Sequence, residues 1–228
     1  MRYVFSDIHG KHELFSRLLE KIKLDNSDTL YICGDVIDKG EHSLKALRLV
    51  TRLPNVKMIL GNHEDMFLKY YRSLLRESGD FDLILKSLRS YFPGDGELLD
   101  FELMDWLEAL PCYVKEKEFI CVHAGLPVDS EGKLLPPETV AAEILLNDRH
   151  FKEPSLVHTS PECVFFGHTQ TNGICGKNRI LAYLRDRSGA PHSISDFYKI
   201  HLDTGAWCSG VLGCFCIDTL RAHYVESK

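Results

Sequence analysis

The sequence lacks three features that would place it in a specialised class of protein. No apolar run approaches the roughly 20 residues that a transmembrane helix needs, and none of the eight cysteines belongs to a Cys-x-x-Cys pair. Positive charge is in the minority, since 27 Lys and Arg stand against 33 Asp and Glu, a formal charge of −6. We therefore expect no membrane span, no thiolate zinc knuckle and no binding to duplex DNA, which needs a basic surface.

What is present is ordinary for a globular protein. Of the 228 residues, 44% are hydrophobic and 26% are charged, so neither disorder nor a fibrous fold is favoured. The amino-terminal residues turn polar too early for the apolar core of a signal peptide. Most cysteines lie inside apolar runs, as buried free thiols do. We expect a single domain, residues 1–228, in the reducing cytoplasm.

The first half of the chain alternates short apolar runs with helical patterns. Residues 2–6, 29–33 and 56–60 have the composition of buried strands, because they are short, contain branched or aromatic residues and are followed by Gly or Asp. Between them, apolar residues recur at helical spacing over 14–22 and 44–50. This β-α-β-α-β order predicts a mostly parallel sheet with helices packed outside it.

Two further regions complete the expected fold. Residues 63–110 have a helical pattern that is broken at 92–96, and the part from about 70 to 110 is a candidate helical cap. From Cys112 onward the pattern becomes that of strands, with a polar surface loop over 185–196. The strands are expected at 113–116, 118–122, 163–166, 180–184, 198–202 and 211–217.

Polar turns follow five of the apolar runs, and each contains Asp, Asn or His. In chain order they are Asp7-Ile8-His9-Gly10, Gly34-Asp35-Val36-Ile37-Asp38-Lys39-Gly40, Gly61-Asn62-His63-Glu64, His123-Ala124-Gly125 and Gly167-His168-Thr169. One such turn alone is usually a helix cap or a core histidine. Because the carboxyl ends of parallel strands converge on a common crevice, we expect the five turns to meet in space. Helix capping does not explain five of them together.

This ordered set of turns resembles the calcineurin-like metallophosphoesterases, and within them the phosphoprotein phosphatase branch in its small bacterial and phage form. The segment Asp203-Thr204-Gly205-Ala206 is similar to that branch as well, so the resemblance covers nearly the whole chain. It implies an α/β fold of four layers, in which two mixed β-sheets pack as a sandwich and are flanked by helices. The metal site would then lie at one edge of the sheets.

The resemblance implies a site for two metal ions. It gives Asp7 and His9 to the first ion and makes Asp35 the carboxylate shared by both. The second site takes its other ligands from three later turns: Asn62, His123 and His168. Oxygen and imidazole donors without a thiolate suit manganese, which we expect first, or iron or zinc. Two such ions about 3.5–4 Å apart can hold a bridging water, lower its pKa and clamp both oxygens of an in-line displacement.

Four more residues are expected to act on the substrate. His63 is the natural general acid, because an imidazolium can donate a proton to a leaving oxygen near neutral pH. The resemblance implies that Asp38 holds the tautomer of this imidazole and that Arg149 binds phosphate. Lys39 stands where the family usually has arginine, and it offers a single charged point in place of a planar fork.

The resulting expectation is a dimetal-dependent phosphoesterase that hydrolyses phosphomonoesters by in-line attack of a metal-bridging hydroxide, foremost a Ser/Thr phosphoprotein phosphatase. The alternative is a symmetrical dinucleoside polyphosphate hydrolase, acting on diadenosine tetraphosphate, because it shares the same five turns. A non-catalytic interaction scaffold on the same fold is a third reading, which the presence of all six ligand positions disfavours. The expected partners are a phosphorylated protein or a small phosphoester, with no DNA and no membrane.

Overall fold

The structure is a computed structural model of the chain, and it describes residues 1–92, 95 and 100–227. Its strands are β1 (Arg2–Phe5), β2 (Thr29–Ile32), β3 (Val56–Met58), β4 (Tyr113–Lys115), β5 (Phe119–Val122), β6 (Cys163–Phe166), β7 (Leu181–Leu184), β8 (Phe197–His201), β9 (Val211–Cys216) and β10 (Arg221–Glu226). Its helices are α1 (His12–Ile22), α2 (Ser43–Arg52), α3 (Asn62–Glu77), α4 (Phe81–Tyr91), α5 (Phe101–Glu108), α6 (Ala142–Asn147), α7 (Asn172–Cys175) and α8 (Ala206–Ser209). Short 3-10 turns cover Pro137–Thr139 and Ile194–Asp196.

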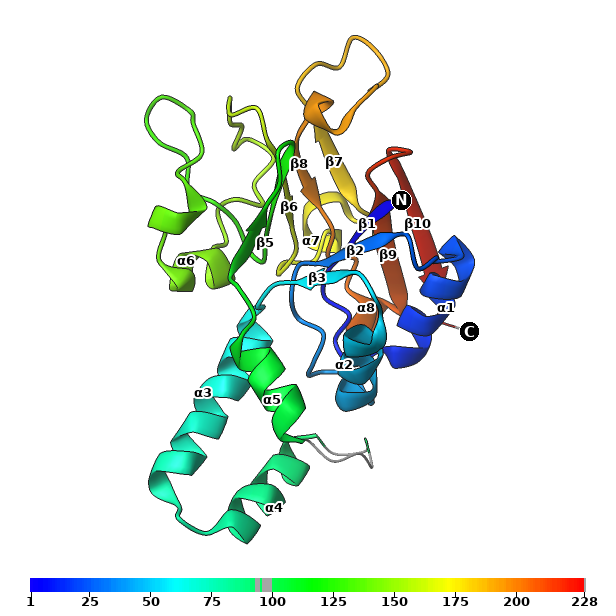
Figure 1. Ribbon diagram of the computed structural model, residues 1–228. Coiled ribbons are helices and arrows are strands. Elements are labelled where there is room, and N and C mark those ends of the chain that lie inside the picture. The colour runs from blue at the N-terminus through cyan, green and yellow to red at the C-terminus, as the bar shows by residue number, and fades with distance from the viewer. Residues whose placement is uncertain (93–94, 96–99, 228) are drawn as a thin grey trace.

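The strands form two mixed sheets of five strands each (Figure 1). Sheet A has the order β10-β9-β1-β2-β3, with β1, β2 and β3 parallel. Sheet B has the order β4-β5-β6-β8-β7, with β5, β6 and β8 parallel. The parallel register pairs Phe5 with Ile32 in sheet A and Phe166 with His201 in sheet B. The turns that follow neighbouring parallel strands therefore begin at the same level.

The pleat of the central strands sends alternate side chains into different cores. In β1, Tyr3 and Phe5 pack in the core that includes α1 and α2, whereas Val4 packs between the two sheets. In β5, Phe119 faces the same inter-sheet core and Ile120 faces outward, toward the core that includes α6. The period of two along each strand thus produces the layers helices, sheet A, sheet B and α6 with its loops. The expected sandwich of two mixed sheets is confirmed.

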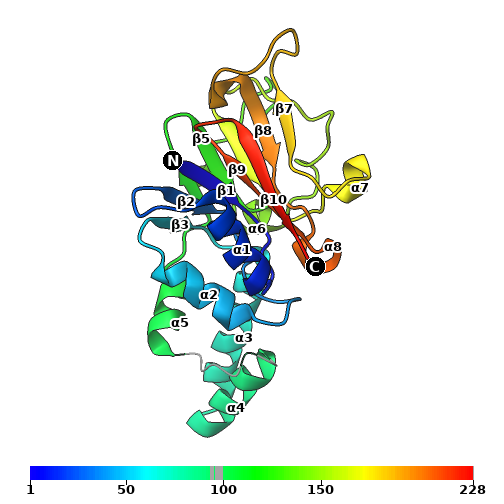
Figure 2. The ribbon, with the colours of Figure 1, turned by 90° about the vertical axis from the view of Figure 1, so that its right-hand side faces the viewer.

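Helices α3, α4 and α5 form an insertion between β3 and β4, and it extends away from both sheets in two perpendicular views (Figures 1 and 2). The Asp80 side chain caps α4 by accepting from the backbone N–H of Asp82 and Leu83, and Asp100 caps α5. The Phe67 ring of α3 lies 4.9 Å from the Tyr91 ring at the end of α4. In the candidate cap at 70–110, residues 93–94 and 96–99 lie outside the described residues, as does most of the break at 92–96.

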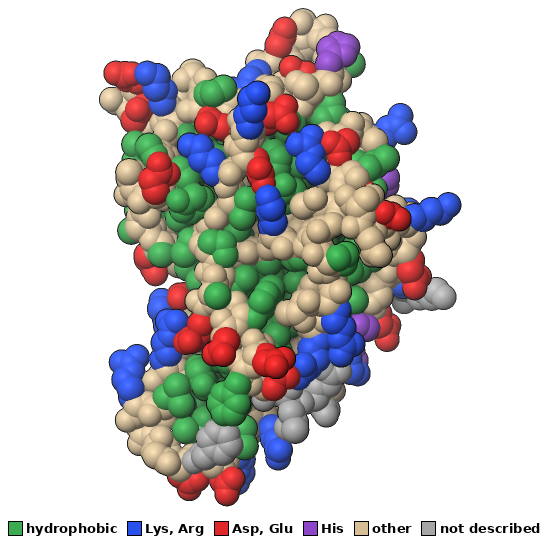
Figure 3. Space-filling model, in the orientation of Figure 1, with side chains coloured by type: hydrophobic (Ala, Val, Ile, Leu, Met, Phe, Trp, Pro, Cys, Tyr) green, Lys and Arg blue, Asp and Glu red, His purple; other side chains and the backbone are tan. Residues whose placement is uncertain are grey.

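Charged side chains of both signs are interspersed on the face shown in Figure 3, without a basic stripe. Large apolar side chains are exposed on the insertion, among them Met66, Leu83 and Phe101. In the part of the chain that the structure describes, no helix combines the length and apolar character that a bilayer crossing requires.

The sequence pattern missed strand β10 and helix α6, as well as the one-turn helices α7 and α8 and both 3-10 turns. Strand β10 is an edge strand whose side chains are mostly half-buried or exposed, so its residues, Arg-Ala-His-Tyr-Val-Glu, are largely polar. Helix α6 has six residues and only two buried side chains, Leu145 and Leu146, which is too short for a helical period to appear. The polar segment 185–196 is a loop except for its last three residues.

Candidate metal centre

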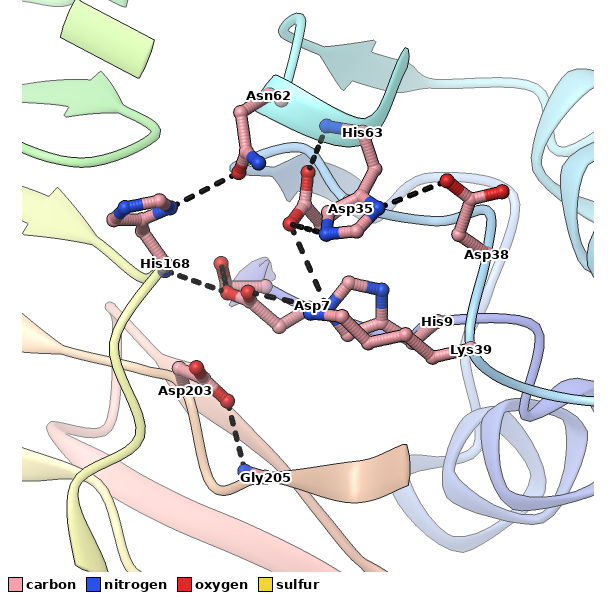
Figure 4. Close-up of polar contacts among 12 residues, drawn as sticks. Asp7, His9, Asp35, Asp38, Lys39, Asn62, His63, His168, Asp203 and Gly205 are labelled. Atoms are coloured by element: carbon pink, nitrogen blue, oxygen red, sulfur yellow. Dashed lines mark hydrogen bonds and ion pairs between the residues drawn. The ribbon is translucent and has the colours of Figure 1, made fainter. Parts of the chain in front are cut away.

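The five polar turns meet where parallel strands of both sheets end, and Figure 4 labels residues of the turns after β1, β2, β3 and β6. Sheet A contributes the turns after β1, β2 and β3, and sheet B contributes those after β5 and β6. The predicted ligands that they carry are Asp7, His9, Asp35, Asn62, His123 and His168. The structure therefore brings together side chains that are up to 161 positions apart, as in the hydrogen bond from His168 N to Asp7 Oδ2.

Asp35 lies at the centre of this cluster. Its Oδ2 atom is 3.6 Å from His9 Nε2, 3.5 Å from His123 Nε2 and 4.0 Å from His63 Nε2. Two groups of ligand atoms, His9–Asp35–His63 and Asp7–Asp35–His123, are each compact enough to hold one cation. Asp35 thus occupies the position that a carboxylate shared by two ions needs, and its bridging role stays a prediction.

The imidazoles present their lone pairs to this cluster. His9 Nδ1 lies 3.0 Å from Ile37 O, and His123 Nδ1 lies 2.7 Å from Cys33 O. A carbonyl oxygen only accepts, so in the neutral rings Nδ1–H donates and Nε2 carries the lone pair. A backbone carbonyl on the distal nitrogen is the usual partner of a metal-binding histidine.

One pair of acceptor atoms lies close together with no proton between them: His123 Nε2, whose ring donates through Nδ1, is 2.8 Å from Asn62 Oδ1. His168 Nδ1 lies 2.9 Å from the same oxygen, and in the neutral ring its N–H donates there and leaves the lone pair on Nε2. Asp7 Oδ1 and His168 Nε2 are buried, and neither has a hydrogen-bond partner among the described residues. Buried polar atoms without partners are costly, and converging oxygen and nitrogen lone pairs are the donor set of a divalent cation of borderline hardness. The residues present fit a dimetal centre.

The charges of the site point the same way. Burial and the neighbouring charges of Asp7 and Glu64 raise the pKa of Asp35 well above its usual range. Burial lowers the pKa of His9 to about 4, so this imidazole is neutral and able to bind a metal at pH 7. Burial alone would raise the pKa of Asp7, but attraction to His123 and His9 and a hydrogen bond from Ser6 hold that pKa below its usual value. Buried carboxylates grouped in this way need positive charge for compensation.

His63 forms a dyad with Asp38. Its Nδ1 atom lies 2.9 Å from Asp38 Oδ2, and its backbone N–H donates to Asp35 Oδ1 over 3.0 Å. Burial alone would lower the pKa of His63, but the hydrogen bond to Asp38 and the charge of Asp35 outweigh it and raise that pKa. The Tyr91 hydroxyl of α4 donates to the same Asp38 oxygen over 3.2 Å, a contact that the sequence pattern did not reveal.

The two expected phosphate-binding cations lie in different surroundings. Lys39 Nζ is 2.9 Å from His9 Nε2, and since an ammonium has no lone pair, the imidazole accepts. Arg149 is exposed just after α6 and makes no hydrogen bond or ion pair with the residues that the structure describes. Burial and the charge of His123 lower the pKa of His168 to about 4, with a smaller contribution from Arg149. Lys39 therefore lies against a predicted ligand, and the contact of both cations with phosphate stays a prediction.

The fully buried side chain of Glu64 holds the Asp35 turn in place through hydrogen bonds. Its carboxylate accepts from the backbone N–H of Asp35 (2.8 Å), Val36 (2.8 Å), Ile37 (3.2 Å) and Gly61 (3.0 Å). Gly61 is required here, because a Cβ atom at that position would lie 2.2 Å from Asp35 Oδ1. Hydrogen bonds to a carboxylate are about twice as strong as neutral ones, so Glu64 fixes the direction of the central ligand.

The turns are also strained. Eight described residues other than glycine have a positive φ, and six of them lie in these turns. The six are Asp7, His9, Asp35, Asp38, Lys39 and His168, with φ between 47° and 68°. Left-handed backbone is unfavourable for residues with a Cβ atom, and it concentrates at functional sites where the surroundings enforce it.

Sequence reasoning left Asp203 without a role, although it lies beside Asp7 in the close-up (Figure 4). It is buried two residues after β8, and its Oδ1 accepts from Gly205 N over 2.8 Å. Burial and the charge of Asp7 raise its pKa well above the usual range. The other turns were recognised because they follow parallel strands. Asp203 also follows one, because β8 is parallel to β6.

Comparison with known proteins gives a family and a set of relatives. The sequence model of the calcineurin-like phosphoesterase family matches residues 3–187. The protein named "Bis(5'-nucleosyl)-tetraphosphatase, symmetrical" from Buchnera aphidicola is 38% identical over 128 residues, which are 54% of this chain and 43% of that protein. The protein of the same name from Neisseria gonorrhoeae is 33% identical over 147 residues, 62% of this chain and 48% of that one. The chain spans about half the length of these curated relatives.

Among solved structures, a crystal structure described as a "putative diadenosine tetraphosphatase" has a TM-score of 0.66 and covers 100% of this chain and 93% of that one. At 21% identity, this likeness shows the fold alone.

The names of the curated relatives contradict our first expectation, a Ser/Thr phosphoprotein phosphatase, and agree with the alternative. The physical reason is that the five turns specify how metal ions are held. They do not specify which group leaves, so the sequence motifs could not separate the two activities.

Proposed function

The chain belongs to the calcineurin-like phosphoesterase family, and on that basis we propose that it is a metal-dependent hydrolase of symmetrical dinucleoside tetraphosphates. A symmetric cut through four phosphates yields two nucleoside diphosphates. The observation that carries the proposal is the convergence of two ligand groups on Asp35, which suits hydrolysis between two phosphates by a dimetal centre. The shared name of the curated relatives supports this choice of substrate.

The proposed cofactors are two divalent cations, with manganese first and iron or zinc as alternatives. Asp7, His9 and Asp35 would hold the first ion. The second would share Asp35 and add three ligands: Asn62, His123 and His168. When bound, the ions supply an activated water and offset the charge of the phosphate chain.

His63 would be the general acid. The bond from Nδ1 to Asp38 directs Nε2, with its proton, toward the side of the ring that faces Asp35. A proton given to the departing diphosphate oxygen neutralises the charge that develops there. The raised pKa of His63 keeps more of the imidazolium present near neutral pH, which supports this role.

Lys39 and Arg149 would bind the anionic phosphates. Lys39 Nζ already lies 2.9 Å from a predicted ligand, and Arg149 is exposed after α6 and contributes to the lowered pKa of His168. The arginine can bind two phosphate oxygens at once, whereas the lysine offers one charged point. This division suits a long polyanion that passes from the ligand cluster to the surface.

We further propose that residues 1–228 work as one domain in the cytoplasm, with the insertion α3–α5 as its cap. The bond between Tyr91 and Asp38 supports the cap, because it ties the insertion to the predicted catalytic dyad. All eight cysteines are free, which supports a reducing compartment.

The decisive assay compares diadenosine tetraphosphate with a phosphoserine peptide, using protein loaded with manganese and checked by elemental analysis. We expect faster turnover of the dinucleotide and ADP as its only nucleotide product. Chelation should abolish the activity and manganese should restore it. AMP and ATP as products, or faster turnover of the phosphopeptide, would contradict the proposal.

A further inference from the structure

Trp207 is a large apolar side chain that remains 40% exposed beside the candidate site. It belongs to α8, which follows the Asp203–Gly205 turn near the ligand cluster (Figures 1 and 4). The other strongly exposed aromatic ring among the described residues is Phe101, which lies in the insertion. A planar ligand that covered this exposed indole would bury apolar surface, which is favourable. Trp207 is therefore a candidate ligand contact.

The segment that presents the indole is closed by hydrogen bonds between its two ends. Gly205 and Gly210 bracket α8 with φ of 72° and 68°, a conformation that favours glycine. The Thr204 hydroxyl donates to Val211 O over 2.7 Å, and the Ser209 hydroxyl donates to Thr204 O over 2.9 Å. These bonds close the loop on itself, so little conformational entropy is lost when a ligand stacks on the ring.

Lys39 connects the indole to the ligand cluster. Its Nζ atom lies 5.6 Å from the centroid of the Trp207 ring and 2.9 Å from His9 Nε2. A single ammonium therefore contacts both the π face and a predicted metal ligand. A polyphosphate bound at the cluster would carry its nucleoside toward this ring, with the ammonium beside the phosphates.

We propose that Trp207 is a stacking platform for one nucleobase of the substrate. The inference deepens the proposed function and rests on it. Every nucleobase has a π face that can stack on an indole, so Trp207 would not select adenine over guanine. It would favour dinucleoside polyphosphates over inorganic polyphosphate, which has no base. Phosphomonoesters that lack a planar group gain nothing from it.

The chain offers a direct probe, because its two tryptophans are Trp106 and Trp207. In a Trp106→Phe variant loaded with manganese, Trp207 is the sole indole and reports on its own surroundings. We expect ADP to quench its fluorescence in a saturable manner, and inorganic pyrophosphate at equal saturation to leave it unchanged. Quenching by both anions alike would overturn the proposal, since it would report phosphate near Lys39 and no stacking.

The matched kinetic test compares hydrolysis of diadenosine tetraphosphate with hydrolysis of inorganic tetraphosphate. Trp207→Ala should lower the ratio of the two kcat/KM values by about 5- to 150-fold, the range for loss of one base stack. Trp207→Phe should restore most of the ratio, and Trp106→Phe should not alter it.

The outcomes separate the two proposals. If the wild-type protein hydrolyses the dinucleotide and Trp207→Ala leaves the ratio unchanged, the platform is wrong and the proposed function stands. If the manganese-loaded wild type cleaves p-nitrophenyl phosphate but neither tetraphosphate, the proposed function fails and the platform fails with it.

Discussion

The two sheets meet at the site with different kinds of side chain and different means of support. Among the predicted ligands, sheet A supplies both carboxylates, the amide and one imidazole, and its turns are supported within the sheet, chiefly by Glu64. Sheet B supplies two imidazoles that are held by groups of sheet A. His123 Nδ1 donates to Cys33 O, and His168 N donates to Asp7 Oδ2.

One half of the predicted site thus depends mainly on a single sheet, and the other half depends on two. All ligands of the first predicted metal position come from sheet A, and the only hydrogen bond from sheet B to them, among the residues that the structure describes, is the one from His168 N to Asp7 Oδ2. The second position needs both sheets in register, because its imidazoles come from across the inter-sheet core. Occupation of the second position should therefore couple to the packing of the sheets, while the first should tolerate its loosening.

Removal of the shared ligand should have the largest effect, because Asp35 is where the two halves join. We expect Asp35→Asn to release both ions and to reduce turnover to the background rate. Affinity for manganese should fall by more than the 10- to 100-fold that is typical when a residue merely orients a ligand. Isothermal titration with manganese checks this, with the exposed Asp186→Asn as control. Two ions bound at wild-type affinity would refute the shared role.

The next largest effect should come from the dyad of sheet A and should depend on the leaving group. His63→Asn should slow hydrolysis of an alkyl phosphate by roughly 10²–10⁴, the range for a lost general acid. The loss should be smaller for diadenosine tetraphosphate, since a diphosphate leaves more easily than an alkoxide. Metal content should stay at two ions, measured by elemental analysis. Loss of an ion would instead make His63 a ligand, as its place near His9 and Asp35 allows.

The support that Glu64 gives to the Asp35 turn provides the third test. Glu64→Gln places an amide N–H₂ against backbone N–H groups, so at least one strong acceptor is lost. We expect the free energy of unfolding of the metal-free protein to fall by about 1.5–3 kcal/mol, measured by urea denaturation. The exposed Glu20→Gln should change it little. An unchanged urea midpoint for Glu64→Gln would show that the hydrogen bonds to the Glu64 carboxylate do not stabilise the Asp35 turn.

The smallest expected effect belongs to sheet B and concerns pH. Burial lowers the pKa of His158 to about 4, and its Nε2 donates to Tyr198 O over 2.6 Å. The unfolded chain binds a proton near pH 6.5. The stabilising effect of the neutral ring is therefore complete above pH 6.5 and is lost as the pH falls toward 4.

His158→Gln keeps a donor for Tyr198 O and removes the titration. Between pH 7 and 4, the wild-type protein should lose about 1–3 kcal/mol more unfolding free energy than this variant. Urea titrations of chelator-treated protein at each pH provide the measurement, with the exposed His192→Gln as control. Parallel pH dependence in the wild type and His158→Gln would mean that the pKa of His158 is the same in the folded and the unfolded protein.

The sequence predicted the parts of the molecule that obey short-range rules. Strands β1, β2 and β3 and the turns after them follow from apolar runs closed by Gly or Asp, and these turns hold most of the candidate ligands. Contacts made across the fold were beyond its reach. Tyr91 approaches Asp38 from the insertion, and Trp207 approaches Lys39 from α8. Neither pair has a sequence spacing that marks it.

The substrate was beyond reach for another reason. The predicted metal ligands follow strand ends, which a sequence pattern can locate. Residues that contact a substrate's leaving group usually lie on surface loops, which vary in length and have no periodic pattern. Lys39 illustrates the point: its identity was visible as a departure from the family, but its partners His9 and Trp207 were not.

The left-handed backbone at Asp7 and His9 lowers the stability of the chain. Replacing Asp7 or His9 with glycine would remove a ligand and at the same time relieve backbone strain of the order of 1 kcal/mol. The fold alone does not require a residue with a Cβ atom at either position, whereas the predicted metal site does. Asp7 and His9 are therefore places where the predicted site lowers the stability of the chain.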